Sequence, residues 1–561
     1  MSGWRTCNDK LRPPQFASSI AGRETRLLPL ELTGDDLFNR VTALRAMGKH
    51  EDAFVLLNAA SNRGDPKAQY QSALMLESGV GIRQDIRRAR ELFRSSAELG
   101  YSDSQAQMGG FYAVGDGVDV DYEQAAVWFD KAAKQGNPAA LNDLGNMYRE
   151  GLYFQRDEGK AISLYKLAAE LGNDFAKLNF GRHLTHSEDP NEVLLGVALL
   201  EQAAEGGLAQ AQATLALHYV DGEIVEKDYP RAFDLFQASA SSGYLNGVVG
   251  LGMSYAKGYG CEKDLARSAQ LFEVAANQGA AQAQFNLGWA YHYGLGVGRN
   301  WELALKWYSA AAEQVNPGGI RGVGEMYELG VAGLKQDFVQ AAKLYERAAE
   351  LGDLVAQFNL GVFYEHGQGV PVNRRLAETY LERSATQGHD SAQLNLGLLY
   401  QSGVEGVPDY KKAIYWLQMA AESGNPKAHG AIGSMYVSGH GVKQDTAKAI
   451  HHLELSAATG EVYSQYNLAL VLRGLDKGPI DQERSTYLLK QAADRGFGPA
   501  QVDLSIHYFK GTGVELDHAE AYKWALLGFL SGDERGEKLQ VYYEENLNEV
   551  DLNTGRLRAT S

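Results

Sequence analysis

Cysteine, basic charge and long hydrophobic runs are all scarce in this chain. Only two of its 561 residues are cysteines, Cys7 and Cys261, so neither a disulfide framework nor a cysteine-rich zinc site is expected. No stretch approaches the roughly 20 apolar residues that a membrane-spanning helix needs, so we expect no membrane insertion. No apolar run follows the first residues, so we expect no signal peptide and predict a cytoplasmic location.

Basic residues are outnumbered by acidic ones. Lys and Arg number 53 and Asp and Glu number 70, which gives a net charge of −17. A general nucleic-acid-binding protein needs a basic surface to displace counterions, and an anionic membrane surface attracts the same positive charge. The balance therefore disfavours both nucleic acid and membrane surfaces as partners.

Glycine, by contrast, recurs at a fixed interval. One glycine closes each of a series of similar segments, and nearly every interval is 36 residues. A glycine suits the end of a helix because the left-handed cap conformation costs it nothing. The series is Gly64, Gly100, Gly136, Gly172, Gly207, Gly243, Gly279, then Val315 in place of glycine, then Gly352, Gly388, Gly424, Gly460, Gly496 and Gly532.

Each segment has the pattern of two helices joined by a glycine loop. In the segment that ends at Val315, Ala283, Leu287 and Tyr291 have helical spacing, residues 294–296 interrupt it, and a second helical pattern starts at Ala304. Small residues let neighbouring helices approach closely, and a bulky residue seven positions before the closing glycine fills the space between them. Such bulky residues are Phe93, Phe129, Tyr165, Phe236, Phe272 and Tyr345.

The full pattern resembles a known repeat family. It reads Ala-x-x-x-Leu-Gly-x-x-Tyr-x-x-Gly-x-Gly-Val, followed by Ala-x-x-Trp/Tyr-x-x-Ala-Ala-x-x-Gly, and is similar to the Sel-one-like repeat (SLR), a relative of the tetratricopeptide repeat. The resemblance implies an all-α fold, a right-handed α–α superhelical solenoid of about thirteen tandem 36-residue helix pairs.

The same pattern divides the chain into four parts. We expect residues 1–34 to be a disordered tail, residues 35–64 a shorter tetratricopeptide-like capping pair, residues 65–532 the thirteen repeats, and residues 533–561 a C-terminal capping helix and tail. Two units depart from the loop pattern, at residues 186–190 and at residues 474–479. These departures either change the curvature of the solenoid or are neutral loop variation.

The sequence offers little catalytic chemistry. The Gly-x-Gly loops link two helices and lack the Lys-Ser/Thr of a phosphate-binding loop, so they are interpreted as turns. His451 and His452 are adjacent and point to different faces of a helix, and His183 and His186 have no metal-binding partner pattern. We therefore predict a protein that is not an enzyme and has neither a cofactor nor a metal site.

In tetratricopeptide-like solenoids, helix A lines the concave surface, so the resemblance implies that ligands bind there. The residue before the helix-A leucine would face this groove, and it is Asn in five of eleven units, including Asn286, Asn359 and Asn395. An amide has donors and an acceptor, so a ladder of amides could hold the backbone of an extended peptide. Alternatively, each Asn is a structural residue that bonds a neighbouring helix.

Candidate pocket residues lie beside these amides. One helix A carries Phe285, Trp289, His292 and Tyr293, the next has Arg321, and the one after has Phe358, Glu365 and His366. Aromatic and arginine side chains are frequent binding hot spots. The alternative for Phe285 and Phe358 is packing against the next repeat.

These residues predict a non-enzymatic adaptor that binds a protein or extended peptide in its groove. The acidity of the chain favours a basic or amphipathic partner. Two alternatives stay open. One is a self-assembling structural protein, and the other is an enzyme that uses His292, Glu365 and His366, which lie in repeats separated by a third.

Overall fold

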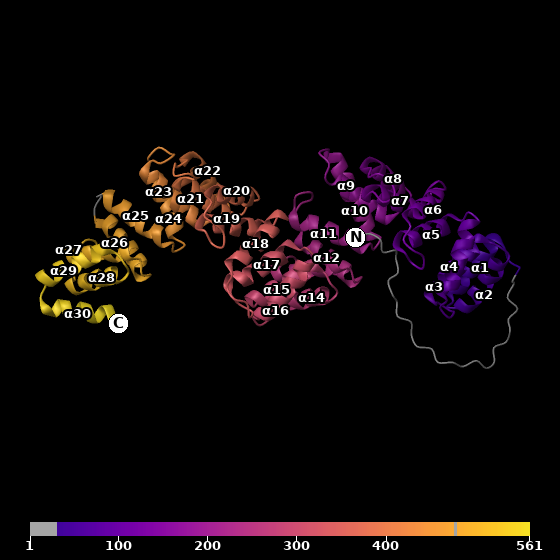
Figure 1. Cartoon of the computed structure of the whole chain (residues 1–561), viewed down its shortest axis with the longest axis horizontal. Helices are drawn as coiled ribbons and strands as arrows, with labels where there is room; N and C mark the ends of the chain where they lie inside the picture. The colour runs from indigo at the N-terminus through magenta and orange to yellow at the C-terminus, as the bar shows by residue number, and fades with distance from the viewer. Residues whose placement is uncertain (1–30, 476–478, 561) are drawn as a thin grey trace. The chain divides into compact units, whose positions relative to one another are not determined.

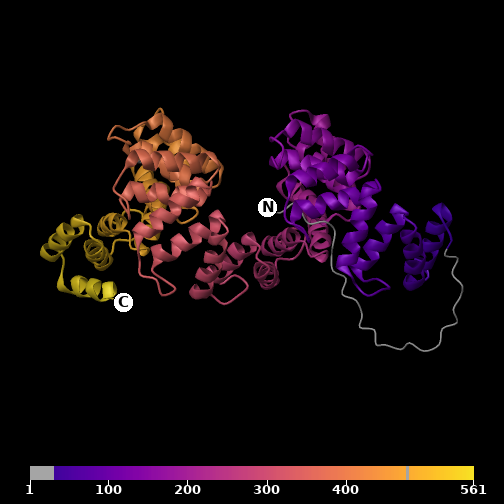
Figure 2. The same cartoon turned by 45° about the vertical axis from the view of Figure 1, so that its right-hand side comes forward.

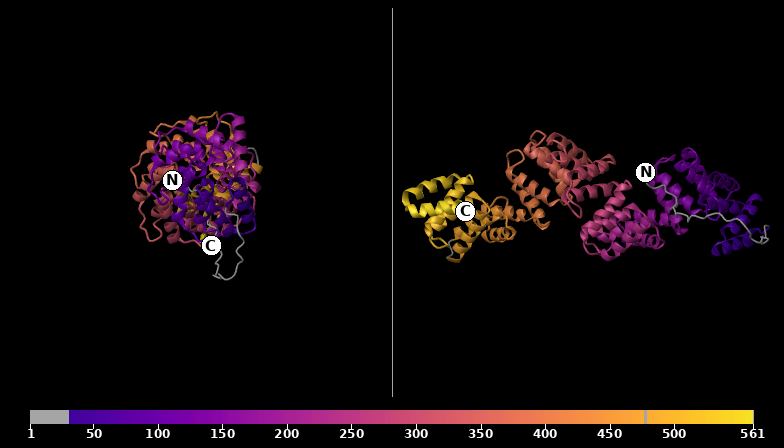
Figure 3. Two further views of the ribbon diagram at one scale, coloured as in Figure 1. Left: turned by 90° about the vertical axis from the view of Figure 1, so that its right-hand side faces the viewer. Right: turned by 90° about the horizontal axis from the view of Figure 1, so that it is seen from below.

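The computed structural model describes residues 31–475 and 479–560, which fold into thirty helices and include no strand (Figure 1). The same helical hairpins are visible from other directions (Figure 2, Figure 3). The chain forms two compact units, Met1–Leu271 and Phe272–Ser561, whose boundary falls within α14 (Leu265–Asn277). The tail predicted for residues 1–34 lies almost entirely outside the described residues.

Thirteen helix pairs follow one another between residues 66 and 530. Within each of the two units, the first helix of a pair packs against the second helix of the same pair. The A helices are α3 (Pro66–Ser78), α5 (Ser102–Val114), α7 (Pro138–Glu150), α9 (Asp174–Leu184), α11 (Ala209–Asp221), α13 (Leu245–Lys257), α15 (Ala281–Tyr293), α17 (Pro317–Leu329), α19 (Leu354–His366), α21 (Asp390–Ser402), α23 (Pro426–Ser438), α25 (Val462–Leu475) and α27 (Gly498–Lys510). The B helices are α4 (Ile86–Glu98), α6 (Tyr122–Ala133), α8 (Glu158–Glu170), α10 (Pro190–Glu205), α12 (Tyr229–Ser241), α14, α16 (Trp301–Glu313), α18 (Phe338–Glu350), α20 (Arg374–Thr386), α22 (Tyr410–Glu422), α24 (Thr446–Ala457), α26 (Pro479–Asp494) and α28 (His518–Leu530). The predicted helical-hairpin solenoid is confirmed.

Shorter elements flank this series. α1 (Gly34–Ala46) and α2 (His50–Asn62) form the N-terminal pair, joined by a tight turn at Gly48. At the other end α29 (Glu534–Asn546) and α30 (Glu549–Thr560) both pack on α28, where the sequence predicts one helix. The backbone is extended at Leu547, and the Asn548 side chain accepts the N–H of Asp551 at 2.9 Å, which starts a new helix.

Within a hairpin, the bulky residue of helix B packs directly on a glycine of helix A. A Cβ atom added at Gly288 would lie 2.6 Å from the Tyr308 ring, and one at Gly322 of the next repeat would also lie 2.6 Å from it. Gly145 and Tyr165 have the same relationship. The Leu-Gly pair of helix A therefore seats the bulky side chain, as the sequence predicts.

The residue that closes each repeat has a left-handed backbone. Gly100 has a φ of +91° and Gly352 a φ of +90°, and the other closing glycines are similar. Val315 keeps this conformation with a φ of +59° although it carries a branched side chain. Its N–H donates to the carbonyl of Ala312, and the N–H of Asn316 donates to that of Ala311, each at 3.0 Å.

An aspartate sets the length of many A–B loops. The Asp121 carboxylate accepts the N–H of Gln124 at 3.0 Å, which caps α6, while its own N–H donates to the carbonyl of Tyr112 in α5 at 2.9 Å. The sequence shows this cap as an aspartate or asparagine that recurs before most B helices, in addition to the recurring glycines. These residues include Asp85, Asp121, Asp157, Asp228, Asp264, Asn300, Asp337, Asn373, Asp409, Asp445 and Asp517.

Buried glutamines join successive repeats. Gln284 donates to the carbonyl of Ala276 in the preceding B helix at 3.2 Å and accepts from Gln314, at the end of its own B helix, at 2.8 Å. Each such amide therefore satisfies polar groups of two helices besides its own. We call the equivalent residues that donate to the preceding helix in this way the glutamine column: Gln69, Gln105, Gln212, Gln284, Gln357, Gln393, Gln465 and Gln501.

Candidate functional site

Within each unit the A helices lie on the inner side of the stack. α5 contacts α7 and α11 contacts α13 in the first unit, and α15 contacts α17 and α23 contacts α25 in the second. Among the described residues, consecutive B helices within either unit do not contact each other to the same extent. The helix-A surface is therefore the concave side, which agrees with the resemblance.

The predicted aromatic residues of α15 gather with Arg321 of α17. The Trp289 and Tyr293 rings lie 4.3 Å apart, and the His292 and Tyr293 rings stack at 4.1 Å. The Arg321 guanidinium lies 5.5 Å from the Phe285 ring and 5.8 Å from that of Trp289. Together with Glu325 and Asp353, these residues form what we call the central cluster.

Exposure divides the central cluster. The Tyr293 side chain is half exposed, and that of Trp289 is partly buried. The ring of Phe285 fills the space beside Gly318, where an added Cβ would lie 2.9 Å from it, so it packs against the next repeat. Tyr293 and Trp289 are therefore the aromatic surface that a ligand could reach.

Arg321 is not a free cation in the groove, in contrast to its predicted role. Its side chain is buried and pairs with Glu325 in its own helix. Its Nε also donates to Asp353 Oδ1 at 3.1 Å. Although burial alone would lower it, these two carboxylates raise the pKa of Arg321. Sequence reasoning missed Glu325 because its position is mostly apolar in the other repeats, as at Val362 and Leu398. It missed Asp353 because that residue has the pattern of a helix cap.

His292 is buried beneath the aromatic surface. Its Nδ1 lies 3.2 Å from the Tyr308 hydroxyl and 3.7 Å from Glu325 Oε2. Burial, with the positive charges of Arg321 and Arg299, lowers the pKa of His292 to about 4, so the ring is neutral at pH 7. Burial raises the pKa of Glu325, and Arg321 partly offsets this effect.

The candidate residues of α19 and α21 are arranged differently. Phe358 packs against His389, which begins the next repeat, with 4.9 Å between the ring centroids and an interplanar angle of 34°. Glu365 is partly buried and His366 is exposed. Among the described residues, neither of them forms a hydrogen bond or an ion pair with His292, so the three residues of the enzyme alternative are not brought together.

The groove amides divide into two groups. Asn179 donates to Asn142 at 3.0 Å and Asn467 donates to Ser434 at 3.2 Å, so both bond the preceding A helix. The partly buried amides of Asn359 and Asn395 make no hydrogen bond to other described residues. The structural alternative holds for the first pair, whereas the second pair keeps its donors and acceptors available.

At the same position in α7 stands an acid, Asp143. Its carboxylate accepts the side-chain amide of Asn142 at 3.1 Å. Burial raises the pKa of Asp143 to about 7, and the amides of Asn142 and Asn146 work against this shift. The Tyr165 hydroxyl in turn donates to Asn146 at 2.8 Å, so a polar network extends from the groove into the hairpin.

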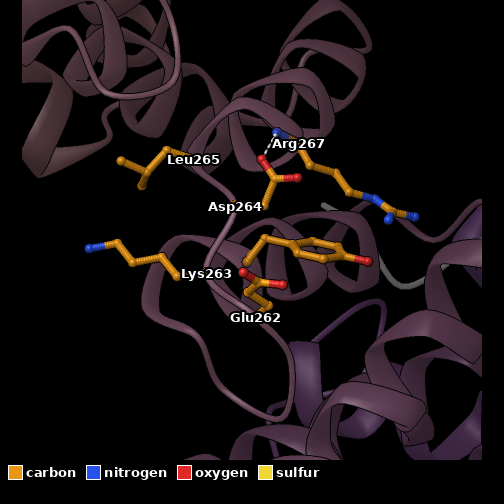
Figure 4. A pocket seen from close by; sticks show the side chains of 6 residues that line it. Glu262, Lys263, Asp264, Leu265 and Arg267 are labelled. Carbon is orange, nitrogen blue, oxygen red and sulfur yellow. Dashed lines mark hydrogen bonds between the residues drawn. The ribbon is translucent and has the colours of Figure 1, made fainter.

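A pocket of about 610 Å³ lies in the first unit at the loop between α13 and α14 (Figure 4). Its lining is largely charged and includes Glu262 and Lys263. Asp264 caps α14 through the N–H of Arg267 at 2.9 Å, and the Arg267 guanidinium lies 4.6 Å from the Tyr255 ring. The pocket contains none of the residues predicted from the sequence.

Residues 31–475 and 479–560 contain neither a membrane-spanning helix nor a cluster of metal ligands. None of their helices combines the length and the apolar character needed to cross a membrane. No group of three or more His, Cys, Asp or Glu side chains converges there in a way that could hold a metal ion.

Comparison with protein families identifies the repeat. The Sel1 repeat model matches twelve segments, which together cover most of the chain: 66–101, 102–137, 138–173, 209–244, 248–279, 281–316, 319–353, 354–389, 390–425, 426–460, 462–497 and 498–533. The chain belongs to the Sel1 repeat family. The gap in the series is the helix pair α9–α10, whose A helix is short and whose loop differs. Sel1 repeats are generally a non-catalytic fold for protein interaction.

Individual relatives match in part. A 69-residue stretch is 41% identical to "ERAD-associated E3 ubiquitin-protein ligase component HRD3A" of Arabidopsis thaliana, which is 12% of this chain and 10% of that protein. The chain thus spans about a tenth of the curated relative. Among solved structures, the protective antigen c5321 of uropathogenic Escherichia coli is 26% identical over 90% of this chain and 93% of its own, with a TM-score of 0.42. A Sel1 repeat protein of Oxalobacter formigenes is 29% identical over 60% and 96%, with a TM-score of 0.36.

Proposed function

We propose that this Sel1 repeat protein is a non-enzymatic adaptor that binds an extended segment of a partner protein on the helix-A face of its second unit. The surface runs from Trp289 and Tyr293 on α15 to Asn359 on α19 and Asn395 on α21. The observation that carries the proposal is the pair of unengaged amides at matching positions of consecutive A helices. Their spacing by one repeat suits a peptide whose backbone crosses successive A helices.

The aromatic surface would supply the affinity. Each amide bond to a peptide contributes only about 0.5–1.5 kcal/mol net, so the amides set the register of the peptide. Burying Tyr293, which is 50% exposed, and the partly buried Trp289 removes apolar area from water. Because the chain carries a net charge of −17, it favours a basic or amphipathic segment through steering.

The family and the curated relatives support a role in assemblies. The HRD3A protein is, by its name, a component of a ubiquitin-protein ligase, and its match to this chain covers 69 residues. We carry over only the general role of a component that holds other proteins, without the pathway.

The proposal is tested by capturing partners from the native cell with the wild-type chain and with matched variants. Tyr293→Ala and the double variant Asn359→Ala/Asn395→Ala alter the concave face. Tyr415→Ala on α22 is the control, because Tyr415 is 54% exposed and lies on a B helix. We expect partners to be lost with the two concave variants and retained with the control. An unchanged set of partners in the concave variants contradicts the proposed surface, and concentration-dependent sedimentation of the chain alone would favour self-assembly.

A further inference from the structure

One acid on the concave face of the first unit is stabilised by amides and has no cation beside it. Asp143 on α7 is partly exposed and stands at the groove position that Asn179 occupies in the next repeat. Asn142 donates to Asp143 Oδ1 at 3.1 Å, and the amide of Asn146 stabilises the same carboxylate. Among the described residues, no Lys, Arg or His side chain forms an ion pair with it.

Two neighbouring side chains fix the direction in which these amides point. Asn142 Oδ1 accepts the amide of Asn179 at 3.0 Å, so Asn142 Nδ2 is left to face Asp143. Asn146 Oδ1 accepts the Tyr165 hydroxyl at 2.8 Å, so its donor is also left for the carboxylate. Asn142 and Asn146 are both buried. The site is therefore built around a hydrogen-bond acceptor, and an ionised carboxylate is such an acceptor.

Other buried acids of the A helices have a guanidinium beside them. Glu325 pairs with Arg321 on its own helix. Asp503, which stands at the same groove position as Asp143, lies 3.4 Å from Nη1 of Arg473. Taking a carboxylate out of water without a cation is unfavourable, and burial raises the pKa of Asp143 to about 7. A positive charge supplied from outside the chain would remove this penalty.

The arginine of α7 does not supply that charge. Arg149 Nε pairs with Glu150 at 3.0 Å, and Arg149 Nη1 lies 3.5 Å from Asn179 Oδ1. Glu150 therefore offsets the charge of Arg149.

The concave surface beside Asp143 also carries an amide. α5 and α7 contact each other, and Gln107 of α5 stands at the groove position that corresponds to Asp143. Gln107 is partly buried and forms no hydrogen bond with other described residues. A segment that crosses these two A helices would therefore meet a backbone-binding amide next to the acid.

We propose that Asp143 binds a lysine or arginine side chain of an extended partner segment that lies on the helix-A face of the first unit. The ammonium or guanidinium group supplies the N–H donors and the positive charge that the carboxylate lacks, and such charge-assisted hydrogen bonds are about twice as strong as neutral ones. Asn142 and Asn146 hold the carboxylate in place for this contact. The site is separate from the surface proposed for the second unit and does not depend on it.

Selection from a random dodecapeptide phage library tests this site without a known partner. The full chain is the bait, as wild type, as Asp143→Asn and as Asp130→Asn. Asp143→Asn introduces the residue of Asn179, so it should fold, and circular dichroism checks this. Asp130→Asn is the control, because it changes the net charge equally but lies on the B helix α6, where Asp130 pairs with Lys134 at 2.6 Å.

Peptides that bind the wild type but not Asp143→Asn should share one lysine or arginine. Replacing that residue of a selected peptide with glutamine should weaken binding to the wild type by about tenfold or more in fluorescence anisotropy. The same replacement should change binding to Asp143→Asn by less than about twofold, since the partner charge is gone.

Asp130→Asn should bind the selected peptides as the wild type does. The proposal is overturned if no peptide distinguishes the wild type from Asp143→Asn, or if the peptides that do so share no basic residue. Equal losses with Asp143→Asn and Asp130→Asn would also overturn it, because net charge alone would then explain the binding.

Discussion

Arg321 and Asp353 are joined through a carboxylate oxygen that also caps a helix. Arg321 Nε donates to Asp353 Oδ1 at 3.1 Å, and the N–H of Ala356 donates to the same oxygen at 2.7 Å. One acid therefore starts α19 and compensates a buried guanidinium of α17. Arg321, which the sequence suggested as a binding residue, therefore links one repeat to the next through this ion pair.

Removing that guanidinium should destabilise the second unit. Arg321→Met leaves Glu325 buried without its cation, and we expect the free energy of unfolding to fall by about 3 kcal/mol. The double variant Arg321→Phe/Glu325→Val should recover most of this loss, because it reproduces Phe358 and Val362 at the same positions of α19. Urea unfolding measures both. A double variant no more stable than the single one would show that the ion pair is not the cause.

His292 should make stability depend on pH on the acidic side. The pKa of His292 is lowered to about 4 in the folded chain, against about 6.5 when unfolded. Between these values the unfolded state binds more protons, so stability falls as the pH drops from 6.5 to 4, by on the order of 3 kcal/mol in full. His292→Gln should flatten this slope in urea titrations at several pH values. An unchanged slope would contradict the buried neutral imidazole.

Asp143 should act in the opposite direction. Its pKa is raised to about 7, so between pH 4 and 7 the folded state binds more protons and stability falls as the pH rises. Asp143→Asn introduces the residue of Asn179 and Asn359 at this position. We expect it to stabilise the chain by about 2 kcal/mol at pH 8, a value reduced because the side chain keeps some contact with water, and to have little effect at pH 4. Thermal unfolding of both proteins at pH 4 and pH 8 measures this difference. An equal effect of the substitution at the two pH values would contradict a raised pKa of Asp143.

Val315 should be a site of backbone strain. Its φ of +59° is left-handed, a conformation that costs a non-glycine residue about 1–2 kcal/mol. Val315→Gly should therefore raise the free energy of unfolding by about 1 kcal/mol, after the entropy that glycine loses on folding. The reciprocal variant Gly352→Val, at a φ of +90°, should lower stability by at least as much. Calorimetric melting compares them, and a lower melting temperature for Val315→Gly contradicts the assignment.

The interval between closing glycines was enough to predict the helical hairpins. Each closing glycine stands where the backbone turns left-handed. In several hairpins the bulky helix-B residue meets a glycine of helix A, as Tyr308 meets Gly288 and Tyr345 meets Gly324. These are local relationships within one repeat, so they are written in the sequence. Where the C-terminal segment leaves the repeat, the sequence predicted one helix and the structure has α29 and α30.

The candidate site was less accessible to the same reasoning. Phe285, Trp289 and Tyr293 lie near one another because they are spaced four residues apart along a single helix. The sequence did not reveal that the Phe285 ring packs beside Gly318 of the next repeat. It also did not reveal that Asn179 bonds the preceding A helix whereas Asn359 does not. Those outcomes depend on which side chain the neighbouring repeat presents.

The repeating sequence by itself determined the fold of this protein, because each hairpin buries its surface only against copies of itself and the period fixes those contacts. The tertiary structure decided which departures from the period meet. Arg321 donates to Asp353 of the next repeat, and His429 contacts His452 across its hairpin. Both pairings depend on side-chain packing between helices, which a period of 36 residues leaves open.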